Sequence, residues 1–158
     1  MRVYHTLKPF YDSESTILIL GSMPSVKSRV DNFYYAHPQN RFWHILSLIY
    51  NIPLDNQESK EAFLHKYHIS LWDTIASCEI TGSSDSSIKD IEVNDISDLL
   101  SKTNIKKIYC TGKTSYNIYN KYIYPKTNMK AIYLPSPSPA NAQLNLNKLV
   151  EIYKIILS

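Results

Sequence analysis

Cysteine is nearly absent from this sequence: only Cys78 and Cys110 occur, and no CxxC pair is present. Two isolated thiols are no basis for a disulfide framework and are typical of a reducing compartment, so we expect both to be buried as small apolar groups. No apolar run approaches the length of a membrane span, and the N-terminal residues lack a signal-peptide pattern. We therefore expect a cytoplasmic protein that does not interact with membranes.

Motifs for a metal ion or a nucleoside triphosphate are also missing. His65 and His68 have no third ligand nearby in the sequence, so we expect a surface pair rather than a metal site. Residues 112–114, Gly-Lys-Thr, resemble the end of a phosphate loop, but Lys107 stands where that loop requires a glycine. A milder interpretation stays open, in which backbone N–H groups at a helix start hold one phosphate there, and simple helix capping is its alternative.

The remaining composition is that of a globular protein, because 44% of the 158 residues are apolar and 20% are charged. A chain of this length is most simply one domain, residues 1–158, with its own core. The formal net charge of +3 favours polyanionic partners only slightly, so any basic surface must be local. Thirteen tyrosines against four phenylalanines suit a wet binding surface, although a compositional bias would give the same excess.

Short apolar runs alternate with helical patterns along the chain. Four of the runs are predicted strands: residues 17–20, 69–72, 107–111 and 130–134. Five stretches have helical spacing: residues 42–50, 58–65, 93–100, 114–122 and 142–157. We expect residues 1–16 to be a polar lead-in, and residues 22–40 and 77–90 to be loops. This order predicts an α/β fold, a three-layer α/β/α sandwich around a four-stranded parallel sheet.

The loops that follow the predicted strands carry the polar and rigid residues. Ligands of open α/β sheets bind outside the carboxyl ends of the strands, where the winding reverses. Here those ends lead into GSMPS (residues 21–25), Asp73 with a serine-rich loop, residues 112–115, and PSPSPAN (residues 135–141). Topology alone therefore predicts that these four loops lie at one edge of the sheet.

The stretch FYYAHPQNRFW, residues 33–43, follows the first of these loops. Its large aromatic side chains lie beside amides, which suits a slot that grips a flat, polar ring. A plain core segment would not contain Gln39, Asn40 and Arg41, because buried amides and charges are costly without partners. We therefore expect this stretch to form part of a binding site.

Five segments resemble, in the same order, the uracil-DNA glycosylase superfamily: GSMPS, AHPQNRFW (36–43), LWDTIASCE (71–79), SSDSSI (83–88) and LPSPSPANA (134–142). The pattern is most similar to the DNA-deoxyinosine (hypoxanthine) glycosylase branch, which is related to the mismatch-specific uracil/thymine glycosylases. The resemblance covers most of residues 17–142. It implies the same four-stranded sheet and a monofunctional DNA glycosylase, with base flipping, hydrolysis of the N-glycosidic bond, and no metal or other cofactor.

The resemblance also implies roles for single residues. Asn40, in the segment HPQN, is expected to orient the hydrolytic water. In the mismatch-specific relatives an Asn after the first strand does this, but here that position is Met23, whose thioether cannot orient a water, which argues against efficient uracil excision. The residues expected to bind the base come from the two flanking segments: Ser22, Met23, Pro24, Ser25, Tyr34, Tyr35 and His37.

Contacts to DNA are expected from nearby cations and from the proline-rich loop. These candidate residues are Arg41, Lys113, Ser136, Ser138, Pro139, Ala140 and Asn141. Cations and serine hydroxyls suit phosphates, which contribute affinity rather than specificity. The tip formed by Pro139 and Ala140 suits a wedge that fills the gap left by a flipped base.

Several of these residues have structural roles as alternatives. Asn40 could tie its loop to the proline-rich loop by hydrogen bonds, and His37 could order the loop without touching substrate. The Phe-Trp pair at residues 42–43 fits a core better than a site. Asp73 could cap a helix, and Asp85 could orient a catalytic group or act as a base itself.

The favoured hypothesis is a DNA glycosylase of base excision repair that removes a deaminated base, with hypoxanthine ahead of uracil or a mismatched pyrimidine. Its expected partner is DNA that contains such a base, and we expect a monomer. A non-catalytic module that binds damaged DNA is the alternative that Met23 favours. Hydrolysis of free nucleosides is a weaker third option.

Overall fold

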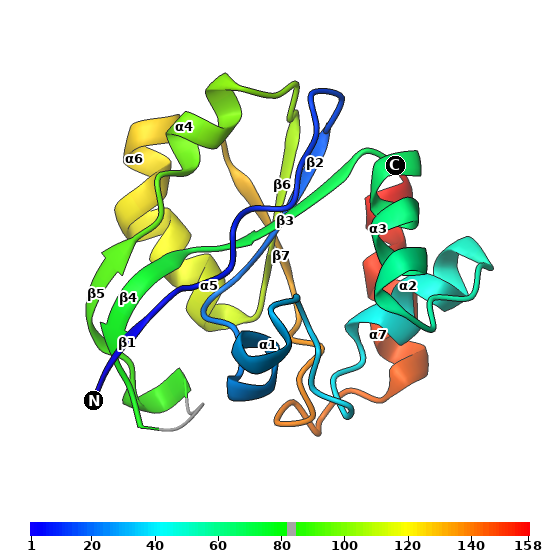
Figure 1. The fold of residues 1–158 in the computed structure, drawn as a ribbon, viewed down its shortest axis with the longest axis horizontal. Helices are drawn as coiled ribbons and strands as arrows, with labels where there is room; N and C mark the ends of the chain where they lie inside the picture. The colour runs from blue at the N-terminus through cyan, green and yellow to red at the C-terminus, as the bar shows by residue number, and fades with distance from the viewer. Residues whose placement is uncertain (82–84) are drawn as a thin grey trace.

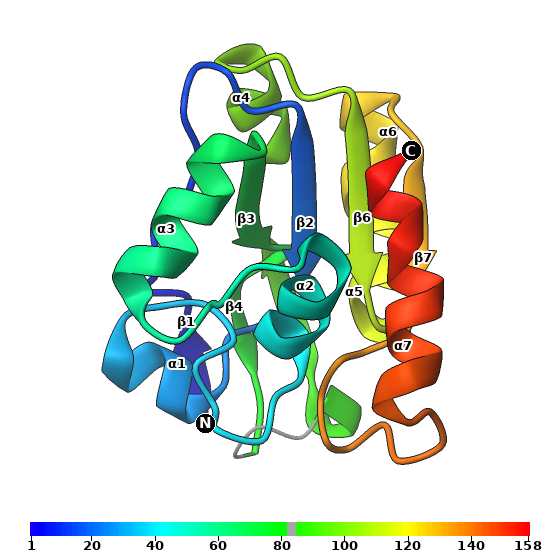
Figure 2. The same ribbon diagram turned by 90° about the vertical axis from the view of Figure 1, so that its right-hand side faces the viewer.

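A computed structural model describes residues 1–81 and 85–158 of the chain. A parallel sheet lies at its centre, in the order β3-β2-β6-β7: β2 (Ile17–Gly21), β3 (Ile69–Asp73), β6 (Lys107–Thr111) and β7 (Ala131–Leu134). β2 pairs with β3 on one side and β6 on the other, with Ile17 opposite both Ile69 and Lys107. Helices cover both faces of this sheet (Figure 1, Figure 2). The predicted three-layer α/β/α sandwich with four parallel strands is confirmed.

The helices divide between the two faces. One layer holds α2 (Phe42–Tyr50), α3 (Gln57–Lys66) and α7 (Leu146–Tyr153), and the other holds α4 (Ile96–Ser101), α5 (Lys113–Ile118) and α6 (Tyr124–Thr127) (Figure 1). A π-helical segment, Tyr119–Ile123, joins α5 to α6. The remaining helical pieces are short: α1 (Val26–Asp31), Asp85–Ser87 and Lys154–Leu157. The predicted long loop over residues 22–40 therefore contains α1.

The central strands are buried on both faces, because successive side chains of a strand point to opposite sides of the sheet. Ile19 and Tyr109 pack into the layer of α2, α3 and α7, whereas Leu18, Leu20 and Cys110 pack into the layer of α4, α5 and α6. Each fully buried aliphatic or aromatic side chain stabilises the fold by about 1.5–3 kcal/mol. This rigid sheet fixes the positions of the strand ends, where the pocket lies.

A second sheet lies beside the first, and the sequence did not predict it. β1 (Arg2–Tyr4), β4 (Ile75–Glu79) and β5 (Lys89–Val93) are antiparallel, in the order β1-β4-β5. The expectation of a plain lead-in over residues 1–16 was therefore wrong, as was a loop over residues 77–90. The helix predicted from residue 93 begins at Ile96. Only Thr74 separates β3 from β4, so the chain passes from one sheet to the other without a loop.

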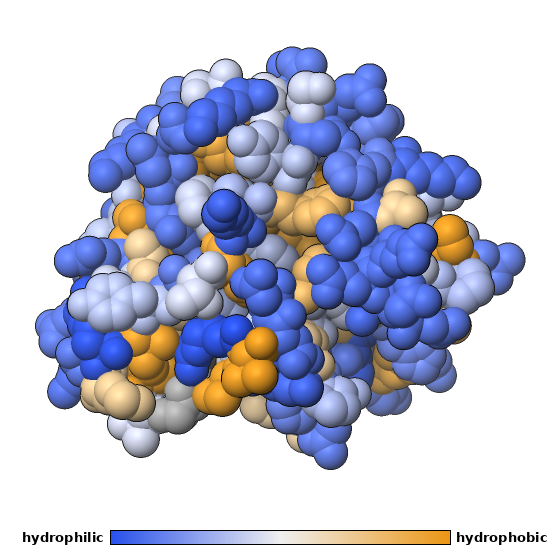
Figure 3. All heavy atoms as spheres, in the orientation of Figure 1, coloured by the Kyte–Doolittle hydropathy of each residue, from blue (hydrophilic) through white to orange (hydrophobic). Residues whose placement is uncertain are grey.

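The two cysteines are free and buried, as predicted. Burial raises the pKa of the Cys110 thiol to about 12, so it stays protonated and unreactive at neutral pH. Among the described helices, none has both the length and the apolarity that a bilayer crossing requires. Polar side chains cover most of the face viewed in Figure 3.

Candidate active site

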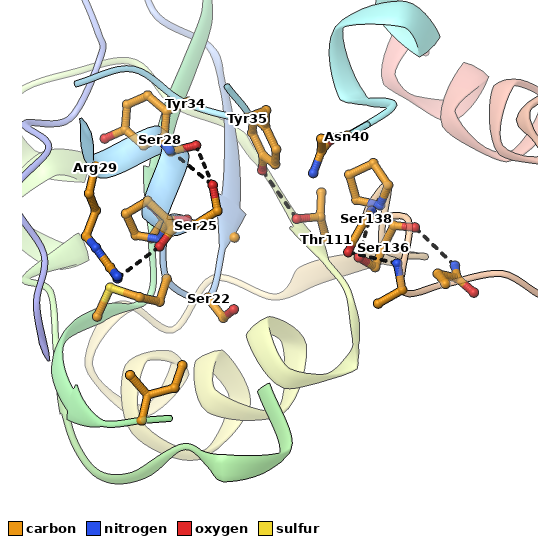
Figure 4. A pocket seen from close by; sticks show the side chains of 18 of the residues that line it. Ser22, Ser25, Ser28, Arg29, Tyr34, Tyr35, Asn40, Thr111, Ser136 and Ser138 are labelled. Carbon is orange, nitrogen blue, oxygen red and sulfur yellow. Dashed lines mark hydrogen bonds between the residues drawn. The ribbon is translucent and has the colours of Figure 1, made fainter. Parts of the chain in front are cut away.

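A pocket of about 510 Å³ opens at the carboxyl edge of the parallel sheet. Its lining comes from the ends of β2, β3 and β6 and from loop residues between 22 and 40 and between 136 and 141 (Figure 4). Three of the four loops that topology placed at one edge thus contribute to this cavity, whereas residues 112–115 do not line it. Lys113, in the first turn of α5, is exposed and does not line it.

Tyr35 is held rigidly at this pocket. Its ring stacks on Phe42, with ring centroids 3.8 Å apart and planes within 15°, and its hydroxyl lies 3.3 Å from Thr111 Oγ1. Burial, with a smaller contribution from the Asp73 carboxylate, raises the pKa of the Tyr35 hydroxyl above its ordinary value. The backbone of Tyr35 has a φ of 53°, in the left-handed region, at a cost of about 1–3 kcal/mol for a residue with a side chain. Such strain is concentrated at functional sites and fixes where this ring points.

Tyr34 lies deeper, at 4% exposure, although it also reaches the pocket. Its hydroxyl donates to the carbonyl of Lys8 at 2.7 Å, and Trp43 Nε1 donates to its carbonyl at 3.0 Å. The Phe-Trp pair at residues 42–43 is buried in the core. Tyr35 is therefore the better placed of the two tyrosines to offer a ring face to a ligand.

Asn40 lines the pocket and lies two residues before the first residue of α2, Phe42. Its Oδ1 accepts a hydrogen bond from the backbone N–H of Phe42 at 2.9 Å. Because that N–H can only donate, the amide atom that faces it must be the oxygen, which leaves Nδ2 for the pocket. Figure 4 shows the Asn40 nitrogen directed into the cavity. The side chain is bonded within its own segment rather than to the proline-rich loop.

His37 lies outside the pocket lining and is exposed. Its Nδ1 accepts from the backbone N–H of Gln39 at 3.1 Å, and its carbonyl accepts from the N–H of Asn40 at 2.9 Å. His37 thus orders the turn that presents Asn40, which is the structural alternative considered for it.

The loop after β2 contributes four expected residues, Ser22 to Ser25, and all four line the pocket. Ser25 caps α1, since its Oγ accepts from the N–H of Ser28 at 3.1 Å. Ser28 Oγ in turn accepts from the N–H of Ala36 at 3.0 Å, which ties α1 to the aromatic segment. Met23 packs against the cluster that contains Ile80, so it forms part of an apolar wall.

Arg41 binds protein rather than facing the open pocket. Its guanidinium donates to three backbone carbonyls of the proline-rich loop, Pro137 at 3.2 Å, Ser138 at 2.8 Å and Asn141 at 2.9 Å, and to the carbonyl of Leu144, just beyond it, at 2.6 Å. These bonds use most of the five donors of a guanidinium. The side chain that we expected to contact DNA phosphate instead holds this loop in place.

The proline-rich loop presents its serines at the pocket. Ser136 Oγ accepts from the N–H of Ser138, and Ser138 Oγ accepts from the N–H of Ala140, both at 3.1 Å. Asn141 Nδ2 donates to the carbonyl of Ser136 at 3.0 Å. These bonds shape the loop, and the tip formed by Pro139 and Ala140 remains exposed beside the cavity.

Asp73 and His5 form a buried pair at the pocket. Asp73 Oδ2 lies 2.7 Å from His5 Nε2, and 6% and 2% of their side-chain surfaces are exposed. A Cβ at Gly21 would lie 2.5 Å from Asp73 Oδ1, so only glycine allows this close approach to β2. Asp73 is followed by Thr74 and then by β4, so no helix begins there for Asp73 to cap. The sequence analysis did not select His5, because only the folded structure brings it next to Asp73.

Arg29 is a second residue that the sequence analysis did not select. It lies in α1, lines the pocket, and donates through NH1 to the carbonyl of Pro24 at 3.2 Å. It was missed because α1 lies inside a stretch that was expected to be a loop. A half-buried guanidinium at the pocket is suited to a phosphate of bound DNA.

The candidate carboxylate Asp85 has its side chain outside the described part of the structure. Within residues 1–81 and 85–158, no group of three His, Cys, Asp or Glu side chains is arranged to hold a metal ion. Of the histidine pair considered above, His65 bonds through Nδ1 to Asp12 Oδ2 at 2.6 Å.

Comparisons with known proteins agree with this architecture. The family model for the uracil DNA glycosylase superfamily matches residues 8–156. A protein named hypoxanthine DNA glycosylase from Methanosarcina barkeri is 36% identical over 110 residues, which are 68% of this chain and 70% of that protein. A protein of the same name from Methanosarcina acetivorans is 32% identical over 139 residues, 87% of each chain.

A solved structure extends the likeness to the whole chain. The solution NMR structure of a candidate uracil DNA glycosylase from Methanosarcina acetivorans superimposes with a TM-score of 0.81, at 28% identity and with all of both chains covered. The sequence match over nearly the full length and this agreement in fold lead to one conclusion. The chain belongs to the uracil DNA glycosylase superfamily.

Proposed function

We propose that this protein is a monofunctional DNA glycosylase that flips hypoxanthine out of DNA and hydrolyses its bond to deoxyribose. One observation supports this most strongly: Tyr35 and Asn40 line the same cavity of about 510 Å³ at the carboxyl edge of the sheet. The two relatives named hypoxanthine DNA glycosylase support the choice of base.

Tyr35 is the platform on which we place the flipped base. Phe42 covers one face of its ring, and Tyr35 also lines the pocket, so we assign the uncovered face to the base. Stacking of a base on an aromatic ring contributes about 1–3 kcal/mol. Extruding a base costs about a few kcal/mol, so this stacking offsets a substantial part of the cost. The hydrogen bond from Tyr35 to Thr111 and the fixed backbone of Tyr35 already hold the ring in place, so little side-chain entropy is lost when a base binds.

Asn40 is the residue that we assign to the attacking water. Its Oδ1 uses one lone pair on the N–H of Phe42, which leaves a second lone pair and two Nδ2 hydrogens for the water. An amide is too weak a base to remove the proton early. This is sufficient when the glycosidic bond breaks first, with its electron pair leaving on the base. The water oxygen then bonds to the sugar carbon, and the released proton neutralises the base.

Residues 22–25 line the cavity beside this position. Backbone N–H groups of this loop are the donors that we assign to the departing anion, because fixed dipoles in an enclosed site stabilise developing charge strongly. Met23 lines the same space, and we assign its apolar side chain to packing against the base rather than to orienting water. This division of roles is consistent with an amide on the opposite wall as the residue that holds the water.

The rim of the pocket is the surface that we assign to DNA. Arg29 and Lys113 are the candidate phosphate contacts, and Ser136 and Ser138 face the same opening. The exposed tip at residues 139–140 is placed to occupy the gap in the duplex. Arg41 supports this surface indirectly, since it holds the loop that carries the tip.

Oligonucleotides with a single deoxyinosine, deoxyuridine or deoxyxanthosine test the proposal. Base release followed by alkali cleaves the strand at the abasic site, which a denaturing gel detects. We expect cleavage of the deoxyinosine strand to be fastest, and no cleavage without alkali. Absence of an abasic product from all three substrates would contradict glycosylase activity. Faster release of uracil than of hypoxanthine would show that the preferred substrate is that of the mismatch-specific glycosylases.

Met23 favours one further candidate function. It lies in the pocket, at the sequence position where the resemblance to the mismatch-specific glycosylases implies a water-orienting Asn. A protein with the same scaffold that binds damaged DNA without cleaving it is therefore the second candidate. Tight binding to inosine DNA in a fluorescence anisotropy assay, with no base release, would identify it.

A further inference from the structure

The charged residues of this chain are distributed unevenly along the sequence. Residues 99–150 hold eight of the 17 Lys and Arg residues but none of the 14 Asp and Glu residues, so the rest of the chain is acidic overall. A stretch with charges of one sign creates a local positive potential, which attracts polyanions. The pocket does not account for this excess, because none of the eight lysines lines it.

Three exposed residues of this stretch form a stripe on α5 and the π-helical segment that follows it. The stripe consists of Lys113, Asn117 and Lys121, which recur every four residues, a spacing that keeps side chains on one side of a helix. α5 begins just after β6 ends and runs back along the sheet (Figure 1). The stripe therefore starts at the rim of the pocket and leads away from it for about 12 Å, at about 1.5 Å per residue.

Both lysines of the stripe keep their charge available to an anion. Within residues 1–81 and 85–158, neither Lys113 nor Lys121 forms an ion pair, whereas Lys102, at the end of α4, lies 2.9 Å from Asp98. Lys121 Nζ lies 5.1 Å from the centroid of the Tyr122 ring. This contact holds the ammonium group at the surface without neutralising it.

Two tyrosines widen the surface beside the stripe. Tyr116, next to Asn117, meets Tyr133 of the edge strand β7 edge to face, with ring centroids 5.6 Å apart. Tyr133 is 39% exposed, and in the described part of the chain neither hydroxyl has a hydrogen-bond partner. Ammonium, amide and phenol groups are among the donors that proteins direct to DNA phosphates. The stripe and its two tyrosines thus offer donors of these three kinds side by side.

A DNA backbone fits this surface better than a protein partner does. Protein interfaces are depleted of lysine at their cores, and the stripe itself consists of polar side chains. The surface is also continuous with the pocket: a Cβ on Gly112 would lie 3.4 Å from Cβ of Ser136, which lines the cavity. One DNA molecule can therefore occupy the pocket and the stripe together.

We propose that one arm of the DNA duplex lies along the stripe from Lys113 to Lys121 while the lesion occupies the pocket. This inference rests on the proposed function, in which the pocket holds the flipped base. A straight duplex across the edge of the sheet would contact only the start of the stripe, because α5 leads away from that edge. An inserted wedge such as the tip at residues 139–140 kinks a duplex, and the kink inclines one arm toward α5. A stripe of about 12 Å faces about three phosphates of one strand, which follow at about 3.4 Å along the duplex axis.

Neutral methylphosphonates at single positions on either side of the lesion test this proposal. The duplex carries 2′-fluorinated deoxyinosine, because fluorine disfavours positive charge on the sugar and binding is then measured without base release. For wild type, we expect neutralisation of a phosphate about three base pairs from the lesion to weaken binding about fivefold, on one arm only. In Lys121→Gln the same neutralisation should cost nothing further, and the slope of log K against log salt should fall by about 0.9.

Lys66→Gln is the matched control. Lys66 Nζ lies 5.5 Å from the ring centroid of Tyr67, much as Lys121 lies over Tyr122, but Lys66 belongs to α3 in the opposite helical layer. The control removes the same charge from the same kind of pair, so it should preserve the one-sided phosphate dependence. Tyr133→Phe removes only a hydroxyl group and should weaken binding less than Lys121→Gln does.

The outcomes separate the two proposals. An equal cost of neutralised phosphates in wild type and Lys121→Gln, or no cost on either arm, would overturn the stripe as a DNA surface and leave glycosylase activity in place. A wild type with one-sided phosphate dependence that releases no base from unmodified deoxyinosine DNA would overturn the proposed function and keep the stripe. An equal loss of affinity in Lys66→Gln would assign the effect to net charge and would also overturn the stripe.

Discussion

Two walls of the pocket are built by different physical means. The aromatic wall, residues 33–43, is held by ring packing: Tyr35 stacks on Phe42 at 3.8 Å, and Phe33 stacks on Trp43 at 5.8 Å. The proline wall, residues 135–144, is held by backbone carbonyls that accept from the guanidinium of Arg41. The first depends on many apolar contacts, whereas the second depends heavily on one cation.

This difference has a consequence for function. A wall that rests on packing positions a ring and an amide with little freedom, which suits base stacking and the chemical step. A wall that rests on hydrogen bonds to one side chain can be released by a single substitution, and it carries the exposed tip assigned to DNA. Arg41, which holds the proline wall, directly follows Asn40 in the sequence. Substitutions at these neighbours should therefore separate chemistry from loop order.

Asn40→Ala should have the largest effect on activity. It removes both the bond to the N–H of Phe42 and the amide that faces the cavity. Loss of one preorganised polar group at a reacting centre reduces the rate by about 10²–10³-fold. The lost hydrogen bond to the N–H of Phe42 should cost only about 1 kcal/mol of stability. Single-turnover excision from deoxyinosine DNA and a thermal melt measure the two effects.

Asn40→Asp is the matched variant for this prediction. It keeps an oxygen that accepts from the N–H of Phe42 but removes the two Nδ2 hydrogens, so it preserves the helix start and changes the pocket. Unaltered turnover in Asn40→Ala would remove Asn40 from the mechanism.

Arg41→Met should release the proline wall and leave the aromatic wall in place. It deletes four hydrogen bonds from a charged donor, each worth about 1.5–3 kcal/mol, although not additively. We expect a loss of about 2–4 kcal/mol in the free energy of unfolding and a tenfold or greater loss of excision. Arg41→Lys should rescue only part of this, because an ammonium cannot reproduce the planar fork.

Hydrogen exchange locates the effect of Arg41→Met. Amides of residues 135–144 should exchange faster, while those of α2 beyond its first turn should not. Faster exchange throughout the aromatic wall would show that the two walls are not independent.

Tyr35→Leu should weaken the platform without removing the wall. Leucine keeps apolar volume against Phe42 but offers no ring to a base. Stacking worth about 1–3 kcal/mol converts to about a 5- to 150-fold loss of affinity for inosine DNA. Tyr35→Phe keeps the ring and loses only the bond to Thr111, so it should cost much less. Equal affinities of the Tyr35→Leu and Tyr35→Phe variants in anisotropy assays would argue against stacking on this residue.

The sequence predicted the aromatic wall better than the proline wall, and the reason is physical. Tyr35, Asn40 and the adjoining helix form one continuous segment, so their proximity is local. The partners of Arg41 are carbonyls about a hundred positions later in the chain, and any residue type supplies a carbonyl. A sequence pattern cannot indicate such a bond, which explains why Arg41 was taken for a phosphate contact.

The same contrast applies to the two sheets. The parallel strands were predicted because a strand buried on both faces reads as an apolar run, as Ile17 to Leu20 does. β1 has three residues, and β5 begins with two charged residues and contains only two apolar ones, so neither has a strong signal. His5 belongs to this weakly encoded part of the fold, which is why its bond to Asp73 was not anticipated.

Lys113→Ala should have the smallest effect on DNA binding and activity. It tests the rim of the pocket, which belongs to neither wall. Lys113 is exposed and outside the pocket lining, so it can contribute only to phosphate binding. Removing one phosphate contact should weaken binding to inosine and normal DNA equally and reduce the slope of log K against log salt by about 1. Lys106→Ala is the control, because this exposed lysine precedes β6 at the opposite edge of the sheet. A change in base preference in Lys113→Ala would instead show that Lys113 contacts the base. A loss of affinity of equal size in Lys106→Ala would show that both effects come from the net charge of the protein rather than from a phosphate contact.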